Sequence, residues 1–162
     1  MRRRGPATVD RLEALYRERY EHFARVASAI TGDGESGRDA VQIAFAAAIQ
    51  SRRAYRGEGP LEGWLWRIVV NEARRLARVR PEVELPGEHE PATNGHGPDE
   101  LGLRAWIGRL PERQREILFL RYYADLDYRA IAAALEIEVG TVSATLSAAH
   151  TKLRKLLKEV ER

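Results

Sequence analysis

The sequence predicts an all-α protein built from two small helical domains, joined by an acidic linker rich in proline and glycine. Apolar residues recur at helical spacing on both sides of a central segment, and no stretch sustains the period of two that a strand requires. The central segment, 81–100, has no apolar periodicity and contains four of the seven prolines. The 162 residues are 44% hydrophobic and 31% charged, which is typical of a folded, soluble protein and not of a disordered one.

The linker divides the chain into a domain at 8–80 and a domain at 101–160. Residues 11–80 carry 13 arginines against 9 acidic residues, and residues 101–162 carry 11 basic against 8 acidic residues. The linker itself, 81–100, holds six acidic residues and no lysine or arginine. Both domains therefore keep enough cations to bind a polyanion, whereas the linker would repel one.

Helix signals place the elements of each domain. In the first domain, Thr8 and Gly32 are the expected start and stop of the first helix, a second helix is expected at 37–52, and Pro60 begins a third that runs to Val79. In the second domain, helices are expected at 101–109, 112–124, 128–135 and 141–159.

The segment 127–157 has the layout of a helix-turn-helix. Its first helix has an apolar face with Ile131 and Leu135, and its second has an apolar face formed by Val142, Leu146, Ala149 and Leu153. A plain antiparallel helical hairpin is the alternative. Glu136 stands where this turn usually has glycine, and a positive φ costs a non-glycine residue about 1 kcal/mol, so a different turn type is also possible.

The third helix of the first domain carries two distinct faces. Arg67, Asn71, Arg74 and Arg78 fall on one stripe about 16 Å long, given a rise of 1.5 Å per residue, with no acidic residue among them. Such a stripe suits successive phosphates, or a base edge bound by the asparagine amide. The alternative is an ordinary solvated arginine face. Trp66 and Val70 lie on a further side, where they either pack on the first helix or form an exposed apolar patch.

Two segments together resemble a known family. DAVQIAF (39–45) followed by YRGEGPLEGWLWRIVVNEARRLAR (55–78) resembles the second region of bacterial sigma factors, and LPERQREILFLRYYADLDYRAIAAALEIEVGTVSATL (110–146) resembles their fourth region. The order, the spacing and the short acidic linker resemble the extracytoplasmic-function (ECF) group. The resemblance implies a sigma factor that binds core RNA polymerase and directs initiation at promoter DNA, with an anti-sigma factor as a further partner.

The resemblance also implies roles for particular residues. Asp39 and Gln42 would bind the clamp helices of the polymerase β′ subunit. The −10 promoter element, where a base is flipped into a pocket beside the loop 56–60, would be contacted by Arg56, Trp64, Arg67, Asn71, Arg74, Arg75 and Arg78. The second helix of the helix-turn-helix would enter the major groove at the −35 element through Thr141, Ser143, Ala144, Thr145, Ser147 and Ala148, with His150, Lys152, Arg154 and Lys155 holding phosphates.

Two departures from the family pattern affect these expectations. Ile43 follows the glutamine of the second-region motif, where the family usually has glutamate, so the polymerase contact is expected to be shared differently. The exposed positions of the recognition helix commonly carry lysine or arginine in the family, and here they carry only serine, threonine and alanine. None of these can make the bidentate contact of arginine with guanine, so −35 readout is expected to be weak or to rely on thymine methyl groups.

Two other classes of function compete with this interpretation. A stand-alone helix-turn-helix regulator would explain 110–157 and leave the DAVQ and WLWRIVVN segments without a role. An enzyme is disfavoured because the four histidines are scattered, and Glu112 and Glu116 look like helix-start and solvated-face residues. We expect no catalytic residue, metal or cofactor; cysteine ligation is excluded because the chain has no cysteine. With no apolar run of about 20 residues and no secretory signal, we expect a cytoplasmic protein without membrane insertion.

Overall fold

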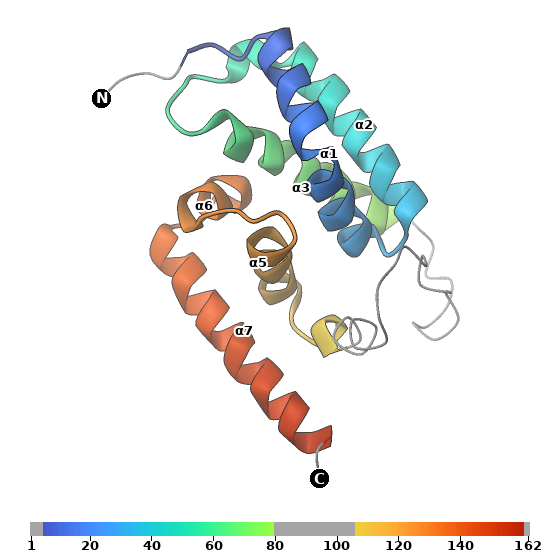
Figure 1. The fold of residues 1–162 in the computed structure, drawn as a ribbon, viewed down its shortest axis with the longest axis vertical. Coiled ribbons are helices and arrows are strands. Elements are labelled where there is room, and N and C mark those ends of the chain that lie inside the picture. The colour runs from blue at the N-terminus through green and yellow to red at the C-terminus, as the bar shows by residue number, and fades with distance from the viewer. Residues whose placement is uncertain (1–4, 80–105, 161–162) are drawn as a thin grey trace.

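The computed structural model describes residues 5–79 and 106–160, and within them it confirms the predicted all-α fold. The elements in chain order are α1 (Val9–Thr31), α2 (Gly34–Gln50), the 3-10 turn η1 (Arg52–Ala54), α3 (Leu61–Val79), α5 (Glu112–Tyr122), α6 (Tyr128–Leu135) and α7 (Val139–Val160). We call residues 5–79 the N-terminal lobe and residues 106–160 the C-terminal lobe. Figure 1 shows the first three helices packed together, with α5, α6 and α7 on the α3 side of that bundle.

Local capping explains where α1 and α2 begin and end. The Thr8 side chain accepts a hydrogen bond from the backbone N–H of Arg11, and Gly32 ends α1 at a φ of 91°, as both were predicted to do. The second helix begins three residues before the predicted position, because the Asp33 carboxylate caps Gly34–Gln50 through the N–H of Ser36 at 2.9 Å. A Cβ at Gly37 would come within 2.2 Å of the Ser28 side chain, so glycine there lets α2 approach α1 closely.

Aromatic packing holds the N-terminal lobe together. Trp66 is completely buried, with its ring centroid 4.3 Å from that of Phe23 on α1. Phe23 also meets Phe45 of α2 edge-on at 5.2 Å, a favoured geometry for aromatic pairs. Val70 is buried as well. Of the two possibilities left open for Trp66 and Val70, the structure therefore shows burial in the core and not an exposed patch.

The C-terminal lobe contains the predicted helix-turn-helix. The Asp127 side chain caps α6 through the N–H of Ala130, and α6 and α7 meet at 100°, which excludes the antiparallel hairpin. Glu136 occupies the turn with a φ of 56°, so the glycine-type turn forms without glycine. The second helix of the helix-turn-helix, α7, begins at Val139, two residues before the predicted start. It buries Val142, Leu146 and Ala149 as predicted.

The two lobes share one hydrophobic core instead of standing apart. The contact is made chiefly by α6 lying on α3, with α5 against α1 (Figure 1). The approach is close, because a Cβ at Gly63 of α3 would lie 3.1 Å from the Cβ of Ala133 on α6. The predicted linker 81–100 and the first part of the helix expected at 101–109 lie outside the described residues; of that helix, 106–108 are helical.

Within the described ranges, no single helix is long and apolar enough to cross a membrane. The pair Tyr128–Leu135 and Val139–Glu159 has sufficient length and apolar composition only when the two helices are joined, and they are bent by 100°.

The turn at Glu136 yields a stability prediction. Replacing Glu136 by Gly should give a protein more stable than the Glu136→Ala variant by about 0.5–1 kcal/mol, because alanine keeps the Cβ that a positive φ disfavours. The alanine variant is the matched control, since both changes remove the glutamate side chain. Urea unfolding of the two variants measures the difference. An alanine variant as stable as the glycine variant would show that the turn carries no strain.

Candidate nucleic-acid interface

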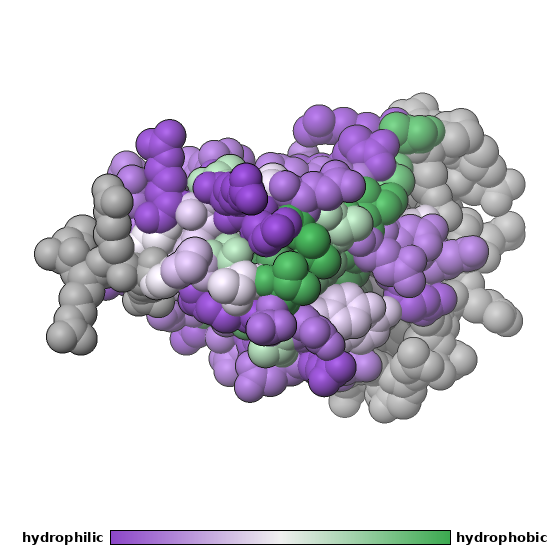
Figure 2. Space-filling view, turned by 90° about the horizontal axis from the view of Figure 1, so that it is seen from above, coloured by the Kyte–Doolittle hydropathy of each residue, from purple (hydrophilic) through white to green (hydrophobic). Residues whose placement is uncertain are grey.

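The outward face of α2 carries the residues predicted to bind polymerase. Asp39 and Gln42 are both exposed. Val41 and Ala44, on the opposite side of α2, are buried against the other helices of the lobe. Ile43 is 41% exposed and Ile49 is also exposed, so this face combines polar and apolar side chains. Seen from above, the molecule shows apolar surface bordered by hydrophilic side chains (Figure 2).

The predicted stripe on α3 is divided by the C-terminal lobe. Asn71 and Arg78 are exposed. Arg67 instead pairs with Glu136 of the helix-turn-helix turn, with Nη1 and Oε1 3.2 Å apart, and Arg74 pairs with Glu116 of α5. No acid of α3 itself lies among the four residues of the stripe, but acids distant in sequence pair with two of them in this conformation.

The Arg74–Glu116 ion pair joins the two lobes and is well shielded from solvent. The Arg74 guanidinium donates two hydrogen bonds to the carboxylate, Nε to Oε1 at 2.6 Å and Nη2 to Oε2. Only 3% of the Glu116 side chain and 19% of the Arg74 side chain are exposed. The hydrogen bond with Glu116 is the main reason why the pKa of Arg74 is raised above its ordinary value. The prediction of Glu116 as a solvated-face residue is wrong, whereas Glu112 is exposed.

The remaining predicted −10 residues lie around the start and the end of α3. Trp64 is half-buried beside the Tyr55 ring, at a centroid distance of 5.6 Å. Arg56 is exposed at the loop that follows η1. Arg75 is exposed and pairs with Glu72 on its own helix, and the Glu72 hydrogen bond raises its pKa. The loop and α3 thus present aromatic and cationic groups, the types that stack on bases and bind phosphates.

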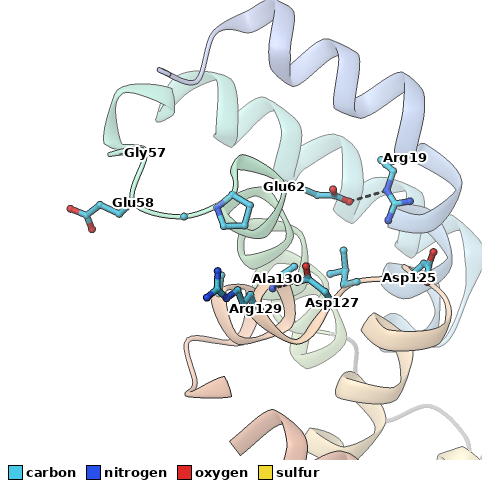
Figure 3. Close-up of a pocket in the computed structure, with 12 residues that line it drawn as sticks. Arg19, Gly57, Glu58, Glu62, Asp125, Asp127, Arg129 and Ala130 are labelled. Carbon is cyan, nitrogen blue, oxygen red and sulfur yellow. Dashed lines mark hydrogen bonds and ion pairs between the residues drawn. The ribbon is translucent and has the colours of Figure 1, made fainter. Parts of the chain in front are cut away.

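A cavity of about 920 Å³ lies where the 57–60 loop faces the C-terminal lobe. Figure 3 shows the loop on one side of it and α6 on the other, with the Arg19–Glu62 ion pair above, at 2.8 Å. Arg19 also donates to the backbone carbonyl of Ala124, which ties α1 to the C-terminal lobe. Four acidic residues and two arginines line the cavity: Glu58, Glu62, Asp125, Asp127, Arg19 and Arg129. This negative balance does not suit a nucleic-acid backbone.

The predicted recognition helix, α7, presents small side chains on its outer face. Thr145 is half-buried, and the other predicted −35 residues in the first half of α7 are exposed: Thr141, Ser143, Ala144, Ser147 and Ala148. Lys152 is exposed further along. His150 is half-buried, and its Nε2 lies 2.9 Å from the Tyr122 hydroxyl, so this histidine is partly engaged within the lobe. The first cation of α7 is Lys152, more than three turns into the helix.

Sequence reasoning missed the residues that join the lobes: Arg19, Gly63, Glu116 and Ala133. One signal could have found part of this contact. Glu116 precedes four consecutive apolar residues, 117–120, and all four are buried. A helix that is apolar around more than one side is covered on more than one side. The run therefore indicated a second packing surface on α5, although not which surface would cover it.

Comparisons with known proteins agree with this geometry. The family described as Sigma-70 region 2 matches residues 15–80, and Sigma-70, region 4 matches residues 101–153. The ECF RNA polymerase sigma-E factor of Escherichia coli K12 is 32% identical over 145 residues, which cover 76% of this chain and 75% of that protein. The RNA polymerase sigma-H factor of Pseudomonas aeruginosa is 29% identical over 149 residues, covering 80% and 77% respectively.

A solved structure shows the same fold. The sigma factor RpoE from Bartonella quintana, in complex with the anti-sigma factor NepR, superposes with a TM-score of 0.72 at 24% identity, covering 93% of this chain and 98% of that chain. The two matched family regions also follow one another in the order of the two lobes. The E. coli relative extends the likeness across both of them. The chain therefore belongs to the ECF sigma factors, which direct bacterial RNA polymerase to initiate transcription at particular promoters.

Proposed function

We propose that this sigma factor binds polymerase and the two promoter elements through three separate surfaces. The α2 face with Asp39 and Gln42 binds the β′ clamp helices of core polymerase, α3 and the 56–60 loop bind the −10 element, and α7 binds the −35 element. The observation that carries the proposal is that the α2 face remains uncovered in a chain that also contains a helix-turn-helix. A regulator that acts on duplex DNA alone has no use for that face.

The chain acts, on this proposal, without catalysis of its own, as a subunit that core polymerase binds and later releases. Its place of action is the cytoplasm, where polymerase and promoters are found. An anti-sigma factor is the expected negative regulator, as the relative from Bartonella quintana is bound to one. Gel-shift measurements separate the alternatives, because a stand-alone regulator binds duplex promoter DNA tightly without polymerase and a sigma factor does so only in the holoenzyme.

Polymerase binding combines polar and apolar contacts in this proposal. Asp39 and Gln42 supply a charge and an amide, and Ile43 adds apolar area where the family usually has an acid. A partly apolar helix face of this kind gains affinity from area removed from water. The charge of Asp39 contributes mostly to orientation and to the rate of encounter.

The polymerase contact can be tested on single substitutions. Asp39→Arg and Gln42→Ala should each weaken binding to core polymerase by tenfold or more, as expected for residues at the centre of an interface, where one truncation costs about 1–2 kcal/mol. Both side chains are exposed, so the fold should be unaffected. Gln50→Ala, at an exposed position on the same helix, is the matched control. Unchanged affinity of the folded variants in a pull-down with core polymerase would reject this assignment.

The −10 contacts separate into one that specifies sequence and several that hold the strand. Asn71 is exposed and its amide can bind a base edge, while Arg78, also exposed, suits a phosphate. Asn71→Ala should relax selectivity at one −10 position by about 1–3 kcal/mol. Arg78→Ala should weaken binding at all promoters and reduce the salt slope by about one unit.

Promoter-library transcription with the holoenzyme measures both effects. Arg17→Ala, which removes an exposed arginine from α1, controls for the loss of surface charge. If the Asn71 and Arg78 variants select the same promoters as the wild type, with the same salt dependence, the α3 face is only a solvated surface.

The −35 contact should depend on phosphates more than on bases. The outer face of α7 offers hydroxyl and methyl groups, so scrambling the −35 element should reduce transcription less than scrambling the −10 element. Ser143→Arg should raise duplex affinity and create a preference for guanine, because it supplies a bidentate donor at an exposed position.

Thr151→Arg, two turns further along α7, adds the same charge and should raise affinity without a base preference. A promoter-mutation series measures these preferences. Dominant, guanine-specific readout at −35 by the wild-type protein would show that the residues facing the groove are different ones.

A further inference from the structure

Tyr122, the last residue of α5, is an exposed aromatic residue that the proposed function leaves without a role. It is 59% exposed, more than any other aromatic side chain in the described part of the chain. Its hydroxyl is nevertheless held, because it lies 2.9 Å from Nε2 of His150 on α7, with the two ring centroids 5.9 Å apart. A tyrosine that is exposed and yet fixed in position is typical of a binding surface.

The hydroxyl of Tyr122 lies beside one side of the recognition helix. Ser143, Ser147, His150 and Arg154 follow one another at intervals of four, three and four residues, which places them on the same side of α7. Ser143 and Ser147 are exposed and belong to the surface proposed to enter the major groove. Because α5 packs against α7 (Figure 1), the end of α5 lies next to a helix side that is proposed to face DNA.

The same side of α7 also supplies a cation. Arg154 lies one turn beyond His150, and its Nε donates a hydrogen bond to the His150 backbone carbonyl at 3.4 Å. This bond uses one of the guanidinium nitrogens and leaves the two Nη groups for another acceptor. Tyrosine and arginine are both among the side chains that donate to DNA phosphates. The acids nearest to Tyr122 in the sequence, Asp125 and Asp127, line the cavity toward the N-terminal lobe instead (Figure 3).

Hydrogen-bond chemistry assigns different parts to Tyr122 and His150. A phosphate oxygen only accepts, so Tyr122 must give it the single proton of its hydroxyl. The phenolic oxygen then accepts the Nε2–H of His150, which the neutral imidazole carries in one of its two tautomers. His150 is half-buried and its Nε2 is used in this way. Tyr122 is therefore the group that reaches the DNA.

We infer that Tyr122 binds a phosphate of the −35 element, with its hydroxyl oriented by His150 and with Arg154 beside it. This inference rests on the function proposed for α7. His150, which was predicted to hold a phosphate itself, is on this inference a positioning residue that acts through Tyr122. Because α7 has no cation before Lys152, a donor at the end of α5 supplies a backbone contact that the small side chains of α7 lack.

Removal of one hydroxyl tests the contact. Tyr122→Phe keeps the ring, and the holoenzyme that contains this variant should bind promoter DNA about tenfold more weakly than the wild type, as expected for the loss of one hydrogen bond to a charged group. Tyr123→Phe is the matched control, because it removes a hydroxyl from the next residue, whose ring stacks on Phe119. Equal affinity of the Tyr122→Phe and wild-type holoenzymes would overturn the inference.

A scan of the DNA backbone locates the phosphate. Uncharged methylphosphonates replace the phosphates of the −35 element one at a time, and the affinity of the holoenzyme is measured for each duplex. One replacement should weaken the wild type about tenfold and the Tyr122→Phe variant less than twofold, because that variant has already lost the contact. If every replacement affects the two proteins equally, Tyr122 does not bind a phosphate there.

The part assigned to His150 has its own test. His150→Ala should weaken promoter binding about as much as Tyr122→Phe, and the double variant should be no weaker than either, because the two residues act on one phosphate. It should also lose its sensitivity at the same methylphosphonate position. Additive losses, with sensitivity lost at a second position, would show that His150 binds a phosphate directly and would overturn its assignment as a positioning residue.

Two further outcomes separate this inference from the function on which it rests. If Tyr122→Phe weakens binding to core polymerase in the absence of DNA, and the methylphosphonate profile is that of the wild type, this surface contacts polymerase and the inference is wrong. If the wild-type holoenzyme is indifferent to every methylphosphonate and to the sequence at −35, the proposed role of α7 is wrong, and the inference is wrong with it.

Discussion

The burial of Trp66 against Phe23 is the interaction on which the arrangement of the molecule depends. It fixes the rotation of α3 about its own axis, because a rotation of the helix would expose the completely buried Trp66 ring to water. Once Trp66 faces α1, the arginine and asparagine side chains on another side of α3 must face away from α1. Gly63, near the start of the same helix, then lies where α6 can approach it. Aromatic packing in the N-terminal lobe thus determines where the C-terminal lobe can dock.

Much of the fold could be predicted from the sequence because its determinants are local. Thr8, Gly32 and the apolar spacing of α6 and α7 act over a few residues, and the structure agrees with each of them. The boundary errors also have local causes, since Asp33 caps α2 earlier than the apolar pattern indicates. The turn at Glu136 was harder, because tertiary packing holds it in a conformation that its own side chain disfavours.

The sequence predicted which residues of α3 form the candidate site, but not which side chains of the C-terminal lobe pair with them. The family motif and the helical spacing both pointed to Arg67, Asn71 and Arg74. Neither could show that Arg74 meets Glu116, because that pair joins residues 42 positions apart across a lobe interface. Helical periodicity specifies which side of a helix a residue lies on, and it contains no information about what the other lobe places there. The acid that pairs with a given arginine is determined by tertiary packing.

The asymmetry of the Arg74–Glu116 pair has a consequence for how such a protein can evolve. Arg74 is the internal partner of Glu116 and also a proposed contact to the −10 element, so a substitution there alters both. Glu116, which also lies 3.7 Å from Arg113 on its own helix, has no proposed contact with DNA, and neither have Gly63 and Ala133, which lie close together across the lobe interface. Substitutions at these positions would change how tightly the two lobes pack while leaving the proposed base contacts intact. The packing of the lobes and the recognition of promoters can therefore vary separately within a single small chain.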